Sequence, residues 1–223
     1  MSEFFGTAHR QLQDEHGTRR LADRLEELAH AAFEPQERDF IQCVRMFFLS
    51  TVDAHGQPTV SYKGGAPGFV RTVGASELVF PNYDGNGMFM TLGNIAECAR
   101  VGLLFIDFER PHRLRVHGTA RITKDEELLS LYPGADCVVH VTAAQIFVNC
   151  GRYIHQDPSK LSPHVPDAEG QQPFPAWKRL NVFDGALPLA DAHHVEEAGG
   201  TIPFEEYSGE ANPAPALMPH KAN

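Results

Sequence analysis

The chain has 223 residues, of which 42% are hydrophobic and 22% charged, and its formal net charge is −10. These fractions are near globular averages and exclude a disordered chain or a coiled coil, while the length suits one ordinary domain with appendages. The negative charge would repel a polyanion over most of the surface, which excludes broad nucleic-acid binding but allows a small phosphorylated ligand at a local cluster of donors.

The N-terminal region shows no sign of an export or membrane segment. It lacks a basic stretch followed by an apolar one, and no apolar run approaches the roughly 18 residues that a bilayer span needs. We therefore expect a cytoplasmic protein that does not associate with membranes.

Two helices are predicted before residue 46. Leu21, Leu25, Leu28 and Ala32 recur at spacings of four, three and four, the period of an amphipathic helix over residues 18–33. A second, shorter helix is predicted to open at Pro35, because proline suits a first helical turn. Neither helix carries obvious chemistry.

From residue 46 the pattern changes to short β-rich runs separated by turn residues: MFFLSTV, PTVSY, FVRTV and LVFPN. A helix entered through a glycine-rich loop follows at GNGMFMTLGNIAEC, and then two long strands, RVGLLFIDF and LRVHGTARI. The polar helix KDEELLSLY precedes a last strand, CVVHVTAAQIFVN. Five or six such strands, without strand–helix–strand alternation, favour a closed or partly closed antiparallel barrel over a doubly wound sheet.

Beyond residue 155 the composition shifts towards Pro, Gly, Ala and acidic residues, which predicts a mostly extended tail anchored at PFPAWKRL. Trp177 and Phe174 could anchor this tail on a neighbouring subunit or on the chain's own barrel, and the sequence leaves both open. We therefore divide the chain into an N-terminal helical segment (1–40), a barrel (41–155) and a Pro/Gly-rich C-terminal extension (156–223).

The cysteines and histidines do not predict a metal site. The four cysteines form no CxxC pair, so we expect buried free thiols, and no histidine has a second ligand at zinc-like spacing. His117 and His140 lie on predicted strands, where a structural role is favoured over that of a proton donor.

Residues 61–73, SYKGGAPGFVRTV, contain a loop whose backbone could approach a ligand closely. Gly64 and Gly65, followed by Gly68, leave no side chains in the way. Lys63 and Arg71 flank this loop and could supply positive charge to a phosphate or to an electron-rich ring edge. On its own, a KGG turn between strands is usually only a turn.

Residues 80–95, FPNYDGNGMFMTLGNI, run from a strand end through a loop into a helix. The unsatisfied N–H groups and the dipole of a helix start favour an anion, and Asn82, Asn86, Thr91 and Asn94 add side-chain donors. An ordinary capped helix would have the same pattern. In residues 112–122, Arg113, Arg115 and His117 share one strand face, which suits either a solvated exterior or a ligand-facing role.

Together, and in this order, these segments resemble the pyridoxamine 5′-phosphate oxidase-related, FMN-binding split-barrel proteins. Later stretches, NCGRYIH (149–155) and PAWKR (175–179), are similar to marks of one bacterial branch of that family. The resemblance covers roughly residues 18–190. It implies a mainly β, α+β fold: a six-stranded antiparallel split β-barrel with N-terminal helices and an extended tail.

The resemblance further implies a homodimer that holds FMN in clefts between its subunits. The stretch from Gly68 to Arg71 would line the isoalloxazine ring, and Arg113 would reach the ring from a neighbouring strand. Asn82 and Tyr83, together with the loop and helix from Asn86 to Asn94, would face the ribityl chain and phosphate. The implied FMN-binding residues are Lys63, Gly68, Phe69, Val70, Arg71, Asn82, Tyr83, Asn86, Thr91, Asn94 and Arg113.

The phosphate loop departs from the pattern of that branch, which is expected to read GNR. Here Gly87 stands where an arginine would lie. The loss of a charged partner of phosphate would remove on the order of 1.5–3 kcal/mol of binding free energy. FMN would then bind weakly, rely on Lys63 or Arg71, or be replaced by another ligand.

Two functional hypotheses follow. The first is an FMN-dependent oxidoreductase acting on a small organic substrate, with oxygen, NADH or NADPH as redox partner; the protein would position the substrate while the flavin carries the chemistry. The second is a non-catalytic flavin- or haem-binding carrier or sensor. We expect no pyridoxamine phosphate oxidase activity as such, because the branch that the chain resembles lacks clear ligands for the substrate phosphate and this tail does not obviously supply them.

Overall fold

The structure, a computed structural model, describes residues 4–157, 163–165 and 171–207. The chain divides into two compact units, one formed by Met1–Ala29, Phe108–His112 and Cys150–Asn223, and the other by His30–Asp107 and Arg113–Asn149. The three-part division of the sequence stays a prediction.

The first unit is helical in its described parts. It contains α1 (Thr7–Glu15), α2 (Arg19–Glu27) and α6 (Leu189–Glu197), with short 3-10 turns η1 (Ala176–Arg179), η2 (Asn181–Phe183) and η3 (Phe204–Glu206). Its apolar centre joins the two ends of the chain, because Leu21 packs with Trp177, Leu180 and Phe183.

This unit differs from the sequence expectation in three ways. α1 was not predicted. The helix expected over 18–33 ends at Glu27, because the chain then turns extended and His30 forms a β-bridge with Ile146. The described tail holds a helix at Leu189–Glu197 rather than an extended segment; the tail expectations for 158–162, 166–170 and 208–223 lie outside the described residues.

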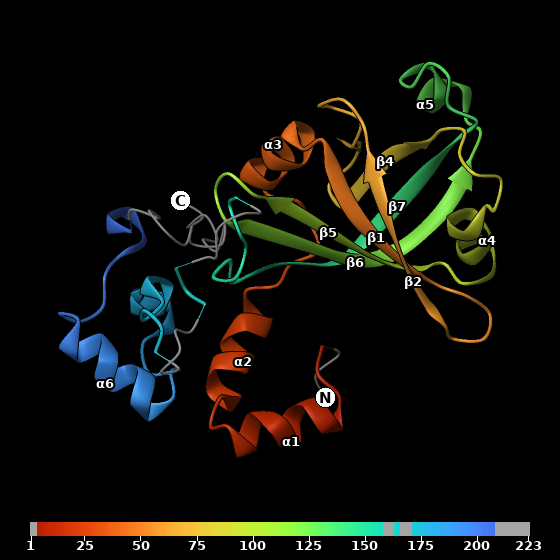
Figure 1. Ribbon diagram of the computed structural model, residues 1–223. Helices are drawn as coiled ribbons and strands as arrows, with labels where there is room; N and C mark the ends of the chain where they lie inside the picture. Colours follow the sequence, from red (N-terminus) through yellow and green to blue (C-terminus); the bar gives the residue numbers. More distant parts are fainter. Residues whose placement is uncertain (1–3, 158–162, 166–170, 208–223) are drawn as a thin grey trace. The chain divides into compact units, whose positions relative to one another are not determined.

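The second unit is built on one antiparallel sheet (Figure 1). Its strands are β1 (Met46–Val52), β2 (Pro58–Gly64), β3 (Arg71–Thr72), β4 (Glu77–Asn82), β5 (Arg100–Asp107), β6 (His112–Thr123) and β7 (Cys137–Asn149), in the order β2-β1-β5-β6-β7-β4-β3. Three helices accompany it: α3 (Pro35–Cys43), α4 (Met90–Glu97) and α5 (Glu126–Ser130). The antiparallel α+β prediction is confirmed.

The predicted number of six strands is wrong, because the sheet has seven. The β-rich run FVRTV gives only the short strand β3, which pairs with β4 over Arg71 and Thr72. The residues before it, Phe69 and Val70, are buried in the core instead of extending the ladder. The structure does not test the homodimer.

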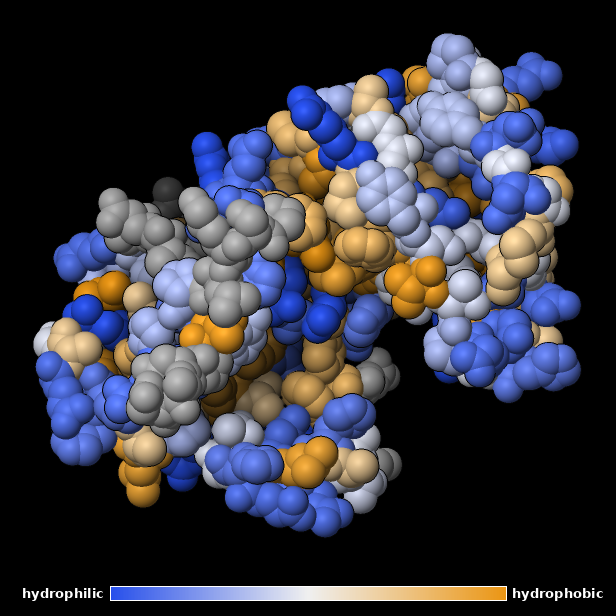
Figure 2. Space-filling view, in the orientation of Figure 1, coloured by the Kyte–Doolittle hydropathy of each residue, from blue (hydrophilic) through white to orange (hydrophobic). Residues whose placement is uncertain are grey.

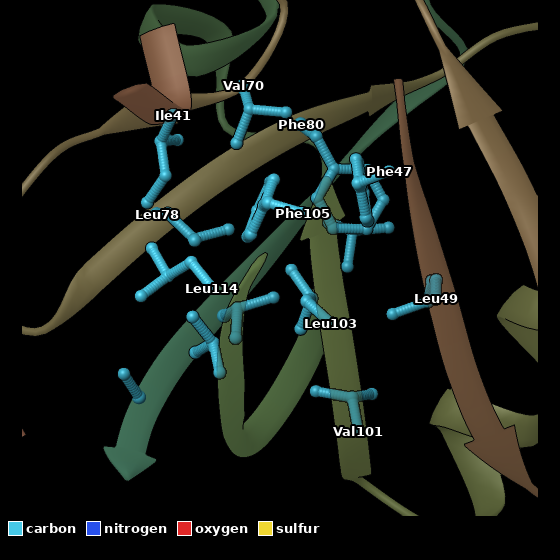
Figure 3. Packing of buried hydrophobic residues seen from close by; sticks show 14 of the residues in the cluster. Ile41, Phe47, Leu49, Val70, Leu78, Phe80, Val101, Leu103, Phe105 and Leu114 are labelled. Atoms are coloured by element: carbon cyan, nitrogen blue, oxygen red, sulfur yellow. The ribbon is translucent and has the colours of Figure 1, made fainter. Parts of the chain in front are cut away.

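Alternation along the strands builds the core. In β1, buried Phe47, Leu49 and Thr51 alternate with half-buried neighbours, as expected when one face of a strand is turned inward. Figure 3 shows the side chains of β1, β4, β5 and β6 converging on one apolar centre. A smaller cluster lies elsewhere on the sheet, where Val79, Tyr132 and Val138 pack with leucines of the α5 region.

In the part of the chain that is described, no helix is both long and apolar enough to cross a bilayer. The four cysteines are free, as expected. The expectation that they are buried holds only for Cys137, since Cys43 is exposed and Cys98 and Cys150 are half-buried.

Candidate functional site

A groove of about 540 Å³ lies in the sheet unit, beside β2 and the loop that leads from β4 into α4. This volume is within the roughly 300–1,000 Å³ that small-molecule sites occupy in proteins. The residues lining the groove are 59–64, Phe69, 81–92 and Asp136.

One part of the groove gathers a cation and two hydroxyls. The Lys63 ammonium donates a hydrogen bond to Thr91 Oγ1 over 3.0 Å, and Ser61 Oγ lies 3.2 Å from the same oxygen. Ser61 and Lys63 are two residues apart on β2, so both side chains leave the strand on the same face. The pairing across 28 residues of chain joins β2 to the first turn of α4.

The environment of Lys63 is poorly suited to an isolated cation. Its side chain is half-buried, and burial lowers the pKa of its ammonium below the usual lysine value. Within the described residues, no carboxylate lies within ion-pair distance of Lys63. A bound anion would offset this cost, because it favours the charged form of the amine.

The start of α4 adds backbone donors. Its N-cap residue, Phe89, provides no side-chain cap, so the first N–H groups of the helix keep hydrogen-bonding capacity that a ligand could use. Asn86 Oδ1 accepts a hydrogen bond from the Met88 N–H over 3.1 Å and shapes the preceding loop. Asp84 and Asp136 also line the groove, so its charge is not uniform.

Six of the eleven residues predicted from the sequence line this groove, and five do not. The structure brings together Lys63, Phe69, Asn82, Tyr83, Asn86 and Thr91. The residues that do not line it are Gly68, Val70, Arg71, Asn94 and Arg113. Assignment of all eleven to FMN stays a prediction.

The five residues away from the groove have other surroundings. Val70 is fully buried in the core, and the buried Asn94 amide donates to Thr51 Oγ1 over 2.9 Å. Arg71 donates through Nε to the Gly68 carbonyl over 3.1 Å, and its guanidinium lies 5.6 Å from the centre of the Tyr132 ring. Arg113 faces Asn149 across the β6–β7 ladder.

The sequence analysis assigned no individual role to Ser61 or to Met88, Phe89 and Met90, although the last three lie in the stretch implied to face the ligand. Ser61 had a usable signal, because it has the same strand parity as Lys63. Phe89 had none: its backbone has φ of +51°, a conformation that no sequence pattern predicts for phenylalanine.

Gly87, which stands where the resemblance implies an arginine, has its own backbone requirement. Its φ is +75°, and a Cβ added there would meet no atom within 4 Å. An arginine at this position would be opposed by the backbone conformation and not by lack of space.

Comparison with known proteins identifies the family. The family model described as pyridoxamine 5′-phosphate oxidase matches residues 33–150, just over half of the chain. The chain belongs to the pyridoxamine 5′-phosphate oxidase family. The matched range includes the whole groove. No curated protein matches the chain.

Solved structures of similar proteins share about half of this chain. HupZ of Group A Streptococcus is 21% identical, covers 52% of this chain and 93% of its own, and has a TM-score of 0.44. An FMN-binding protein of Syntrophomonas wolfei is 14% identical, with coverages of 61% and 96% and a TM-score of 0.40. The haem storage protein HutZ of Vibrio cholerae is 22% identical, with coverages of 52% and 94% and a TM-score of 0.38.

Proposed function

We propose that this member of the family is a flavoprotein that binds FMN in the groove and catalyses an oxidoreductase reaction on a small organic substrate. The observation that carries the proposal is the cluster of Lys63, Ser61 and Thr91 at the start of α4. It offers one cation, two hydroxyls and backbone N–H groups, a donor set that suits a phosphate monoester.

The apolar remainder of the groove suits the other half of such a ligand. Phe69, Pro81 and Leu92 line it together with the exposed side chains of its rim. When bound, FMN would supply hydride or electron transfer. The residues of this chain would anchor the phosphate, exclude water from one side of the ring and leave room for a substrate.

The proposal includes three expectations that rest on the sequence. The protein acts as a homodimer, in the cytoplasm, with NADH, NADPH or oxygen as redox partner. Light scattering of the purified protein measures the first of these. Anaerobic addition of NADH or NADPH, followed by the loss of the visible flavin bands, measures the redox partner.

The test of FMN binding uses two ligands that differ by a phosphate. Purified protein is titrated with FMN and with riboflavin, and flavin fluorescence reports binding. Lys63→Met keeps an unbranched side chain, one atom shorter, and removes its charge, so we expect FMN affinity to fall by about 10- to 100-fold, the range for a charged hydrogen bond. Riboflavin affinity should not change.

Lys124→Met is the matched control, because Lys124 is an exposed lysine of the same unit that does not line the groove. This variant should bind both flavins as the unchanged protein does. A protein that remains colourless with added FMN would contradict the proposal. An equal loss of FMN affinity and riboflavin affinity in Lys63→Met would also contradict the proposal, because the phosphate would then not bind at Lys63.

A second candidate, a non-catalytic flavin- or haem-binding carrier or sensor, is favoured by Gly87, which stands where the resemblance implies a charged donor. Haem iron is held by His, Cys, Met or Tyr in proteins. The groove has no His or Cys among its lining residues, but it has Met88, Met90, Tyr62 and Tyr83. A Soret band after addition of haemin, with no spectral change on addition of FMN, would favour this candidate.

A further inference from the structure

Phe89 has an unfavourable backbone conformation. Its φ of +51° is the only positive φ of a non-glycine residue in the described chain. For an L-residue this region brings Cβ close to the following carbonyl, and bulky side chains are uncommon there. Such strain is usually retained where it contributes to a binding site.

The Phe89 side chain also has an unfavourable environment. Its exposed fraction is 64%, and its neighbours Met88 and Met90 are exposed by 65% and 46%. Three consecutive exposed apolar residues leave apolar surface in water, where burial by a partner would be favourable. Nothing in the described residues offsets either cost.

The cap of α4 does not require a phenyl ring. The Phe89 carbonyl accepts the Gly93 N–H over 2.8 Å, and this backbone bond would form with any residue at position 89. Glycine or asparagine would adopt the left-handed conformation at lower cost. The phenyl ring is therefore not explained by the local fold.

The three side chains form part of the rim of the groove. On β2, Val60 and Tyr62 line the same groove and are exposed by 67% and 64%. Figure 2 shows apolar side chains at the surface over the region where β1 and β2 are labelled in Figure 1. The groove thus combines an apolar rim with the cationic site at Lys63, which is complementary to a ligand that has a flat apolar part and an anionic end.

We propose that Phe89, flanked by Met88 and Met90, packs its ring against the planar aromatic part of a phosphate-bearing ligand whose phosphate binds at Lys63. This inference rests on the proposed function and assigns the ring contact of the ligand to this run of residues. The methionines adapt their shape to the ring edge, because their side chains are flexible and polarisable. The strained backbone keeps the phenyl ring at the rim.

Phe89→Gly separates this role from a structural one. Glycine removes the ring and relieves the strain at φ +51°, so the protein without ligand should unfold at the same or a higher temperature. FMN and riboflavin should each bind about tenfold more weakly, because both contain the ring. A purely structural residue would show the opposite result, a loss of stability with ligand affinity unchanged.

Phe89→Trp is the rescue variant. It keeps an aromatic surface, so FMN affinity should remain within about threefold of the unchanged protein, and stacking with the indole should quench the fluorescence of bound flavin. Phe108→Gly is the control, because Phe108 is an exposed phenylalanine that does not line the groove. This control should leave the affinities for FMN and riboflavin unchanged.

The outcomes are distinct. Unchanged FMN affinity in Phe89→Gly, when the unchanged protein binds FMN, would overturn this inference and leave the proposed function in place. Loss of an oligomer in Phe89→Gly without loss of FMN affinity would assign Phe89 to a protein interface and also overturn it. Failure of the unchanged protein to bind FMN or riboflavin would overturn both proposals.

Discussion

The rings of Phe47 and Phe80 meet edge to face, with centroids 5.1 Å apart and an interplanar angle of 72°. Phe47 belongs to β1 and Phe80 to β4, and β5, β6 and β7 lie between these strands in the order of the sheet. Two strands so far apart can share a contact only if the sheet coils around its apolar face. The coiling encloses a single core within the unit.

Phe47 is the centre of this contact, so its truncation should be costly. It is fully buried and also packs against Phe69 and Phe105, with centroids 5.9 and 5.2 Å away. We expect Phe47→Ala to lower the free energy of unfolding by about 3–5 kcal/mol, as measured by urea denaturation. Phe48→Ala is the control, since Phe48 is half-buried on the opposite face of β1 and should cost less. Equal losses of unfolding free energy in the two variants would contradict the assignment of Phe47 and Phe48 to opposite faces of β1.

The strands of the sheet could be predicted from the sequence where local patterns determine their ends. β1 and β7 match their predicted runs residue for residue, because alternation and flanking turns mark both ends. The short extent of β3 could not be predicted, since FVRTV has strong strand character but Phe69 and Val70 are taken into the core. The contact between Phe47 and Phe80 depends on the coiling of the whole sheet, which no local pattern reports.

The candidate site was predictable in part for a similar reason. Lys63 and Thr91 stood out by charge and by position at a helix start, and the structure joins them. Val70 and Asn94 lie in the same segments but face the interior, since position in a motif does not determine side-chain direction. Phe89 was not singled out, because no sequence pattern predicts its positive φ.

Gly118 should not tolerate a side chain. A β-bulge lies between His117 and Gly118. A Cβ added to Gly118 would lie 2.1 Å from the Thr142 carbonyl oxygen. Because that atom belongs to the backbone of β7, it cannot move away without breaking the ladder. We expect Gly118→Ala to cost more than about 3 kcal/mol of unfolding free energy or to prevent folding.

Gly93→Ala is the matched control for this prediction. Gly93 is in α4, and a Cβ added there would meet no atom within 4 Å. Alanine should stabilise the protein by up to about 1 kcal/mol, because it favours the helix and restricts the unfolded chain. Thermal unfolding of the two variants should therefore shift in opposite directions, and a similar shift in both would contradict the geometry at Gly118.

Tyr132 should make stability fall at alkaline pH. Its hydroxyl donates to the Val79 carbonyl over 3.3 Å, and burial raises the pKa of the phenol to about 12. The folded state therefore favours the neutral phenol, and this contribution is complete below the unfolded pKa of about 10 and lost as pH rises towards 12.

Tyr132→Phe removes both the hydrogen bond and the titration. It should cost about 1 kcal/mol at neutral pH, because the Val79 carbonyl loses its donor. The difference in unfolding free energy between the two proteins should shrink and then reverse its sign between pH 10 and 12. A constant difference across this range would show that the Tyr132 phenol titrates alike in the folded and unfolded states.

The titration of Lys63 should change protein stability and FMN affinity in opposite directions as pH rises. Burial lowers the pKa of its ammonium in the folded protein, so between that pKa and the usual lysine value the unfolded chain binds more protons. The unfolding free energy contributed by Lys63 therefore rises with pH through this window, and the full cost of burial is present below it. Lys63→Met removes the cost, so in the absence of ligand this variant should unfold at a higher temperature than the unchanged protein at neutral pH. The difference in unfolding temperature should narrow as pH rises through the window.

FMN binding should change in the other direction, since the anion needs the charged amine. The FMN affinity of the unchanged protein should fall with pH through the same window, whereas its riboflavin affinity should not. If FMN and riboflavin share one pH profile in the unchanged protein, the ammonium of Lys63 does not hold the phosphate.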